Sequence, residues 1–226
     1  MIPLRDVIPS RTTPYITVTI ILLNAVAWLV EISLPQNDLN QFLYVYGVVP
    51  AQFTWTTLVT SMFLHGSWMH VIGNMWYLWI FGDNVEDRLG HGLFIIFYLL
   101  CGIIAAFGQI AADPMSTLPT IGASGAIAGV MGAYFVLYPR SRVLTLVPLI
   151  LWWELFELPA IVLLGFWFLM QLFSAGAIAV TSSTHGSGGV AFMAHVAGFV
   201  FGGVSVLVLR LVLRQPPARP WEDSAY

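Results

Sequence analysis

Four polar side chains lie in otherwise apolar stretches of the sequence and could together carry out nucleophilic catalysis. Ser124 lies in GASGAIAG, His195 in MAHVAGFVFGG, and His70 and Asn74 in HGSWMHVIGNMWYL. A serine hydroxyl becomes an effective nucleophile when an adjacent base takes its proton during the attack, and neutral histidine is such a base. We therefore expect Ser124 and His195 to form a catalytic dyad.

Attack of a serine on an amide carbonyl creates an oxyanion, which needs hydrogen-bond donors that are already fixed in place. The side-chain amide of Asn74, an imidazole N–H of His70 and the backbone N–H of Ser124 at a helix N-terminus are suitable donors. His70 and Asn74 are four residues apart and therefore share one face of a helix. We expect both side chains to stabilise the oxyanion.

Each of these residues also has a purely structural interpretation. The spacing Gly-x-x-x-Gly follows Ser124 and occurs again after His195, and it is typical of closely packed membrane helices. His70 and Asn74 could form a polar clamp between two helices. The combination favours catalysis, because two glycine-lined helices each present one member of a Ser/His pair.

Composition indicates that the helices carrying these residues lie in a membrane. Of the 226 residues, 58% are hydrophobic and only 8% are charged, and the mean hydropathy is +0.85. A hydrocarbon core of about 30 Å needs about 20 apolar residues per helical crossing. Segments of suitable length lie near 15–33, 67–82, 92–111, 124–139, 158–180 and 190–213. We predict an all-α polytopic membrane protein with a bundle of six transmembrane helices.

The arginines indicate the orientation of this bundle. The chain has no lysine, and with six crossings and an inside N-terminus all its arginines fall on the inner side, where basic residues gather. We therefore expect residues 1–14 to be a cytoplasmic N-terminal segment, 15–214 the membrane domain and 215–226 a flexible cytoplasmic tail.

In this topology the second, fourth and sixth helices all begin at the outer face. Ser124, His195, His70 and Asn74 then lie at similar depth, each within about two turns of a helix start. No acidic residue falls in the middle of the membrane, so we expect a dyad without a third, acidic member.

These patterns resemble the motifs of the rhomboid family of intramembrane serine proteases. The matching motifs are Gly-x-Ser-Gly from Gly122, Ala-His-x-x-Gly-x-x-x-Gly from Ala194, His-x4-His-x3-Asn from His65 and Gly-x3-Glu-x3-Gly from Gly82. Any one of them is a weak signal, but all four in order on the second, fourth and sixth helices are specific. The resemblance covers nearly the whole predicted membrane domain and implies a rhomboid-like bundle.

The resemblance also implies an activity, which is endopeptidase cleavage of transmembrane segments of other membrane proteins within the lipid bilayer. Ser124 and His195 would form the dyad, and His70 and Asn74 would serve the oxyanion. Glu86 and Arg88 would have a structural role, tying the inner end of the second helix. We expect no cofactor, no metal ion and no nucleic acid, and we expect a multi-pass protein of a bacterial cytoplasmic membrane.

Two positions depart from the family pattern. Some members carry a tyrosine one turn after the nucleophile that stacks on the catalytic histidine, whereas this chain has Ala128 there. A Trp-Arg pair is also not evident in FTWTTLVT, in the outer segment 34–66 that we expect to lie partly at the membrane surface. The sequence therefore does not identify what orients His195. Gln171 is expected to make a hydrogen bond between helices.

Three other classes of membrane protein fit less well. A transporter or channel would favour acidic residues in the membrane or inverted repeats, and the sequence has neither. A zinc protease of the His-Glu-x-x-His type is disfavoured because His65 and His70 are five apart with no glutamate between them. A non-catalytic rhomboid-like protein that binds transmembrane helices is the main alternative, although such relatives lack the serine or the histidine.

Overall fold

The protein is described by a computed structural model that covers residues 1–148, 152–181 and 191–212. The main helices are α1 (Tyr15–Ser33), α4 (Trp68–Leu89), α5 (His91–Ala112), α6 (Ser124–Leu137), α7 (Ala160–Thr181) and α8 (Phe192–Val212). Shorter elements are α2 (Gln36–Tyr46), α3 (Thr57–Thr60) and the 3-10 turns η1 (Pro50–Gln52) and η2 (Ser61–Phe63). The strands are β1 (Ile2–Asp6), β2 (Arg142–Pro148) and β3 (Trp153–Pro159). The predicted tail 215–226 lies outside the described residues.

One helix lies in each of the six predicted segments. Among the described helices, four are long and apolar enough to cross a membrane, namely α1, α5, α8 and α7 over Ala160–Ala177. The helix α6 has only 14 residues, about 21 Å, and α4 ends in a charged turn. The chain is therefore an integral membrane protein, while the count of six crossings stays a prediction.

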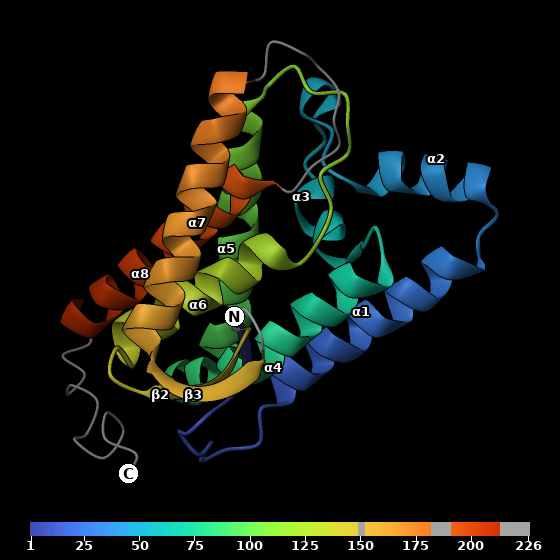
Figure 1. Cartoon of the computed structure of the whole chain (residues 1–226). Helices are drawn as coiled ribbons and strands as arrows, with labels where there is room; N and C mark the ends of the chain where they lie inside the picture. The colour runs from blue at the N-terminus through green and yellow to red at the C-terminus, as the bar shows by residue number, and fades with distance from the viewer. Residues whose placement is uncertain (149–151, 182–190, 213–226) are drawn as a thin grey trace.

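The short α6 lies at the centre of the helices rather than against lipid (Figure 1). Every residue from Gly125 to Tyr134 is buried, and α4, α5, α7 and α8 all pack against this helix. A helix that is apolar all round belongs in such a position. Its burial explains how a helix shorter than the hydrocarbon core can sit inside a membrane protein.

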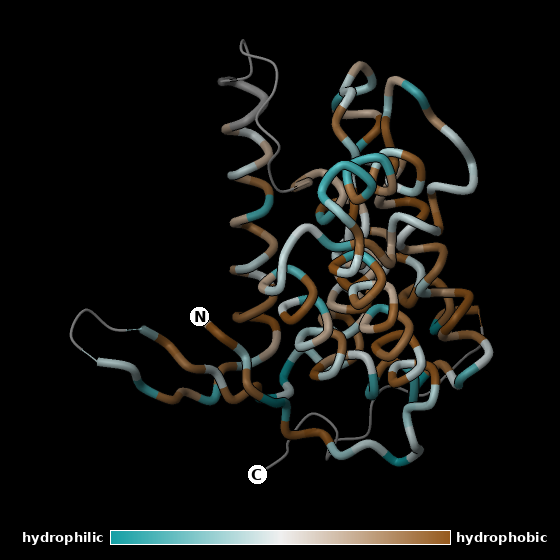
Figure 2. The backbone as a smooth tube through the Cα atoms, turned by 90° about the vertical axis from the view of Figure 1, so that its right-hand side faces the viewer, coloured by the Kyte–Doolittle hydropathy of each residue, from teal (hydrophilic) through white to brown (hydrophobic). Residues whose placement is uncertain are grey.

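The outer faces of the peripheral helices are apolar. Leu29 on α1, Phe173 on α7 and Leu211 on α8 are 59%, 73% and 72% exposed. Much of the helical backbone is coloured as hydrophobic in Figure 2, with hydrophilic stretches between. Such an extensive apolar surface is unfavourable in water and indicates contact with lipid chains.

The predicted helical fold is confirmed in the main, but the chain is not all-α, because three strands form a small antiparallel sheet in the order β1-β2-β3. Strands β2 and β3 make a hairpin that extends away from the helices (Figure 2), with Thr145 opposite Phe156. Strand β1 pairs with β2 across more than a hundred residues of sequence, for example Ile2 with Leu146. Burial alternates at the start of β2, where Val143 and Thr145 are buried, but the sequence RVLTLVP does not alternate between apolar and polar residues and so gave little signal for a strand.

The outer segment 34–66 is built largely of short helical elements, α2, η1, α3 and η2.

At the opposite end of the bundle, Glu86 anchors the start of α1. Its carboxylate accepts hydrogen bonds from the backbone N–H groups of Ile16 and Thr17 at 2.9 and 2.7 Å, and it contacts Nδ1 of His91 at 2.6 Å. The first N–H groups of a helix have no partner within it, so this carboxylate caps α1. The expected structural tie is confirmed for Glu86.

Candidate active site

The structure brings Ser124 and His195 into direct contact. Ser124 is the first residue of α6, and His195 lies in the first turn of α8. The distance from Ser124 Oγ to His195 Nε2 is 2.7 Å, which is a hydrogen bond in a partly buried position. A hydroxyl and an imidazole at this distance can exchange the hydroxyl proton.

Glycines allow α6 and α8 to approach closely enough for this bond. A Cβ on Gly198 of α8 would collide with the backbone carbonyl of Gly125, and one on Gly202 would collide with that of Gly129. A Cβ on Gly132 would in turn collide with the carbonyl of Phe199. The two helices are therefore in backbone contact, as the paired Gly-x-x-x-Gly spacings predict.

The loop that leads into Ser124 is held in a conformation that favours glycine. Gly122 has φ +121, and its N–H donates to the carbonyl of Ser61 at 2.9 Å. Two residues earlier, Thr120 and Val48 form an isolated antiparallel bridge. These bonds fix the start of α6 to the outer segment and so fix the position of the hydroxyl.

His70 presents a donor to the same loop. A Cβ built on Gly122 would lie 2.7 Å from His70 Nε2 and 3.7 Å from Ser124 Oγ, so both groups border Gly122. The N–H of Gly66 donates to His70 Nδ1 at 3.4 Å. Because Nδ1 accepts that bond, the ring proton lies on Nε2 in the neutral imidazole. The N–H on Nε2 therefore faces the region of the serine.

Asn74 lies one turn along α4 from His70 and is 7% exposed. Its Nδ2 is buried and has no hydrogen-bond partner among the described residues. A buried donor without a partner is costly. A hydrogen-bond acceptor on a bound ligand would satisfy this donor.

His195 is held on its other side by α7. Its Nδ1 is 2.8 Å from Oε1 of Gln171, which confirms the expected interhelical hydrogen bond of this glutamine. The Trp167 ring packs against the imidazole with centroids 5.8 Å apart. The sequence interpretation did not identify Trp167, although its spacing of four residues from Gln171 places both on one face of α7.

Comparison with known proteins agrees with this architecture. A family model of the rhomboid domain matches residues 52–211, well over half of the chain. The chain belongs to the rhomboid family. The rhomboid protein YdcA of Bacillus subtilis is 34% identical over 124 residues, which cover 53% of this chain and 61% of YdcA.

Two further rhomboid relatives cover different shares of the chain. Rhomboid-like protein 11, chloroplastic, of Arabidopsis thaliana is 28% identical over 82% of this chain and 65% of its own length. Rhomboid protease GluP of Bacillus subtilis is 39% identical over 41% of this chain and 18% of its own length. The chain thus spans less than two thirds of the length of each of these relatives.

A buried acid supports the histidine motif of this rhomboid domain and was missed in the sequence. Glu31, near the end of α1, accepts the backbone N–H of His65 with both carboxylate oxygens at 3.1 Å. The His65 ring is only 1% exposed and packs edge-on against His70 at 5.0 Å. Burial, followed by the charge of His70, lowers the pKa of His65 to about 4. His65 is therefore a neutral packing residue beside His70.

Proposed function

We propose that this rhomboid protein is an intramembrane serine endopeptidase, with Ser124 as nucleophile and His195 as general base. The observation that carries the proposal is the 2.7 Å hydrogen bond between Ser124 Oγ and His195 Nε2. In the first step Oγ bonds to the peptide carbonyl carbon while its proton passes to Nε2. The tetrahedral species then collapses, and Nε2–H protonates the leaving amine. A water molecule, deprotonated by His195, hydrolyses the resulting ester and frees Ser124.

The oxyanion of the tetrahedral species would be stabilised by His70 and Asn74. The support is that Nε2 of His70 borders the serine loop and that Nδ2 of Asn74 is a buried donor lacking a partner in the described structure. The N–H of Ser124, at the start of α6, is a third candidate donor. Donors fixed before the reaction stabilise the developing charge without reorganising.

The substrates we propose are transmembrane segments of other proteins. A membrane helix hides its carbonyls in internal hydrogen bonds, so a substrate must unwind locally before Ser124 can attack it. The dyad lies at the N-terminal ends of α6 and α8. With both termini on the cytoplasmic side, as the arginines favour, cleavage would occur near the outer end of the substrate segment.

Cleavage of a model transmembrane substrate by the purified protein in detergent tests the proposal. Ser124→Ala and His195→Ala should each abolish turnover without loss of folding, because the members of a catalytic unit act together. Ser33→Ala, at the exposed end of α1, is the matched serine control and should keep full activity. A fluorophosphonate probe should label the wild type and the Ser33 variant but not Ser124→Ala. An unlabelled and inactive wild type would instead favour a non-catalytic helix-binding protein.

A further inference from the structure

The base of the proposed dyad has two contacts that the dyad mechanism does not explain, and both come from α7. Gln171 meets the ring nitrogen of His195 that faces away from Ser124, at 2.8 Å. Trp167, one helical turn earlier, packs on the same ring at an interplanar angle of 38°. Together these contacts fix the in-plane direction and the tilt of the imidazole.

The hydrogen bond to Gln171 determines which ring nitrogen can act as the base. Oε1 of Gln171 faces Nδ1 of His195, and a glutamine oxygen only accepts hydrogen bonds, so this arrangement requires the proton on Nδ1. In the neutral ring, Nε2 is then the nitrogen with a free lone pair, and this atom is the one that faces Ser124 Oγ. The opposite tautomer could not accept the serine proton.

Trp167 of α7 supports the His195 ring in a chain that has no aromatic residue at position 128 of α6. Ala128, one turn after Ser124, is fully buried and has only a methyl side chain, so α6 supplies no aromatic ring to His195 from that position. Trp167 packs against both His195 and Phe199, at 5.8 and 6.0 Å between ring centroids. An indole on the neighbouring helix thus supports the imidazole.

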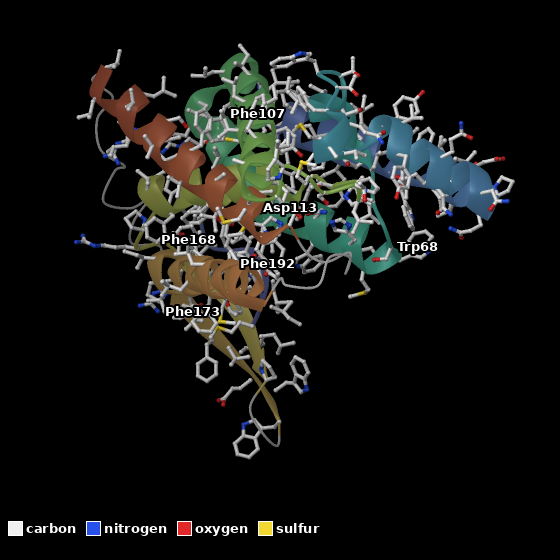
Figure 3. All side chains as sticks on the ribbon, turned by 90° about the horizontal axis from the view of Figure 1, so that it is seen from above. Trp68, Phe107, Asp113, Phe168, Phe173 and Phe192 are labelled. Atoms are coloured by element: carbon white, nitrogen blue, oxygen red, sulfur yellow. The ribbon has the colours of Figure 1, made fainter. Side chains whose placement is uncertain are left out.

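Resting on the proposed function, we propose that Gln171 is a positioning residue that holds His195 in its Nδ1–H tautomer, with Trp167 setting the ring tilt. The catalytic unit is then completed by α7 as well as by α6 and α8. Phe168 on α7 stacks on Phe199 of α8 at 4.6 Å, whereas Phe173 points away from the bundle (Figure 3). The dyad is therefore oriented only while α7 remains packed on α8.

The direct test is the tautomer of His195, measured by the ¹⁵N chemical shifts of labelled histidine, with His195→Ala assigning the signal. The wild type should show a protonated Nδ1 and an unprotonated Nε2. Gln171→Leu, which keeps the side-chain size but removes the acceptor, should give a mixture of tautomers. A wild-type ring protonated on Nε2 would overturn the proposal, whatever the activity of the protein.

Kinetics give the second test. Gln171→Leu should lower kcat about ten- to a hundredfold, with KM within about twofold, because one hydrogen bond and the ring position are lost. Gln171→Glu keeps an acceptor at the same place and should recover most of that loss. Gln109→Leu, the same change in the neighbouring helix α5, is the control and should keep kcat.

The outcomes separate this inference from the proposed function. Wild-type kcat in Gln171→Leu, or equal losses in the Leu and Glu variants, would refute the positioning role while leaving the dyad intact. A wild type that neither cleaves substrate nor reacts with a fluorophosphonate would refute the protease, and the tautomer measurement would still decide the role of Gln171.

Discussion

Replacing Gly122 by alanine should displace the proposed oxyanion donor His70 while leaving the hydrogen bond between Ser124 and His195 in place. The new Cβ would lie 2.7 Å from Nε2 and 2.8 Å from Cε1 of His70, whereas it would meet Ser124 Oγ at 3.7 Å. Ordinary carbon contacts begin at about 3.5 Å, so the ring or the loop must move by roughly 0.7 Å or more. The hydroxyl needs no such movement.

The same substitution also strains the backbone. Gly122 has φ +121, a region that residues with a Cβ rarely adopt, and holding alanine there costs about 1–3 kcal/mol. We therefore expect a lowered melting temperature together with a roughly hundredfold fall in kcat, since an oxyanion donor is displaced. Fluorophosphonate labelling of Ser124 should persist.

The assay compares kcat, melting temperature and probe labelling in Gly122→Ala and in Gly92→Ala. Gly92 lies near the start of α5, and a Cβ there meets nothing within 4 Å, so its variant should keep activity and stability. Loss of stability in Gly122→Ala without any fall in kcat would refute the argument that His70 acts on the oxyanion from beside this glycine.

Three further predictions address separate parts of the molecule. Asn74→Ala should lower kcat about a hundred- to a thousandfold with labelling of Ser124 retained, and wild-type turnover with a lower melting temperature would make Asn74 a packing clamp. Glu86→Gln weakens the cap on α1, so thermal unfolding should occur at lower temperature with kcat per folded molecule unchanged, and a kcat defect would contradict the structural role. Because the folded pKa of His65 is about 4 and the unfolded value about 6.5, the unfolded state binds more protons between these values. The free energy of unfolding should be highest above about pH 6.5 and fall by up to about 1.4 kcal/mol per pH unit towards pH 4. Unfolding of His65→Gln, measured at each pH, should show a flatter dependence.

The long helices and the meeting of Ser124 with His195 could be predicted because their signals are local. Hydropathy marks each apolar segment without reference to the rest of the chain, and one helix lies in each predicted segment. The Gly-x-x-x-Gly spacing predicts close contact of two helices, and His195 and Ser124 both stand at the start of such a stripe. The catalytic roles of these residues stay predictions.

The sheet could not be predicted in the same way because its pairing is not local. Strand β1 needs β2, which follows more than a hundred residues later. The end of β1 is tied to the core by Asp6, which accepts hydrogen bonds from the Tyr134 hydroxyl at 2.8 Å and from Nδ2 of Asn84 at 2.9 Å. The alternating pattern of β2 and β3 is weak among so many apolar residues. The contact of Gln171 with His195 depends similarly on the rotation of α7 about its axis, which hydropathy does not specify.

The choice of an amide rather than an acid beside His195 follows from the surroundings of the dyad. A carboxylate at the same place would also accept the Nδ1 proton, but an ionised group in an apolar setting carries a large desolvation cost. Glutamine supplies the acceptor while remaining neutral, so it orients the ring without that cost. A neutral glutamine stabilises the imidazolium cation less than a carboxylate would. More of the stabilisation of the transition state must then come from the hydrogen-bond donors to the oxyanion. We propose that Nδ2 of Asn74, which has no partner among the described residues, and the Nε2–H of His70 supply this stabilisation.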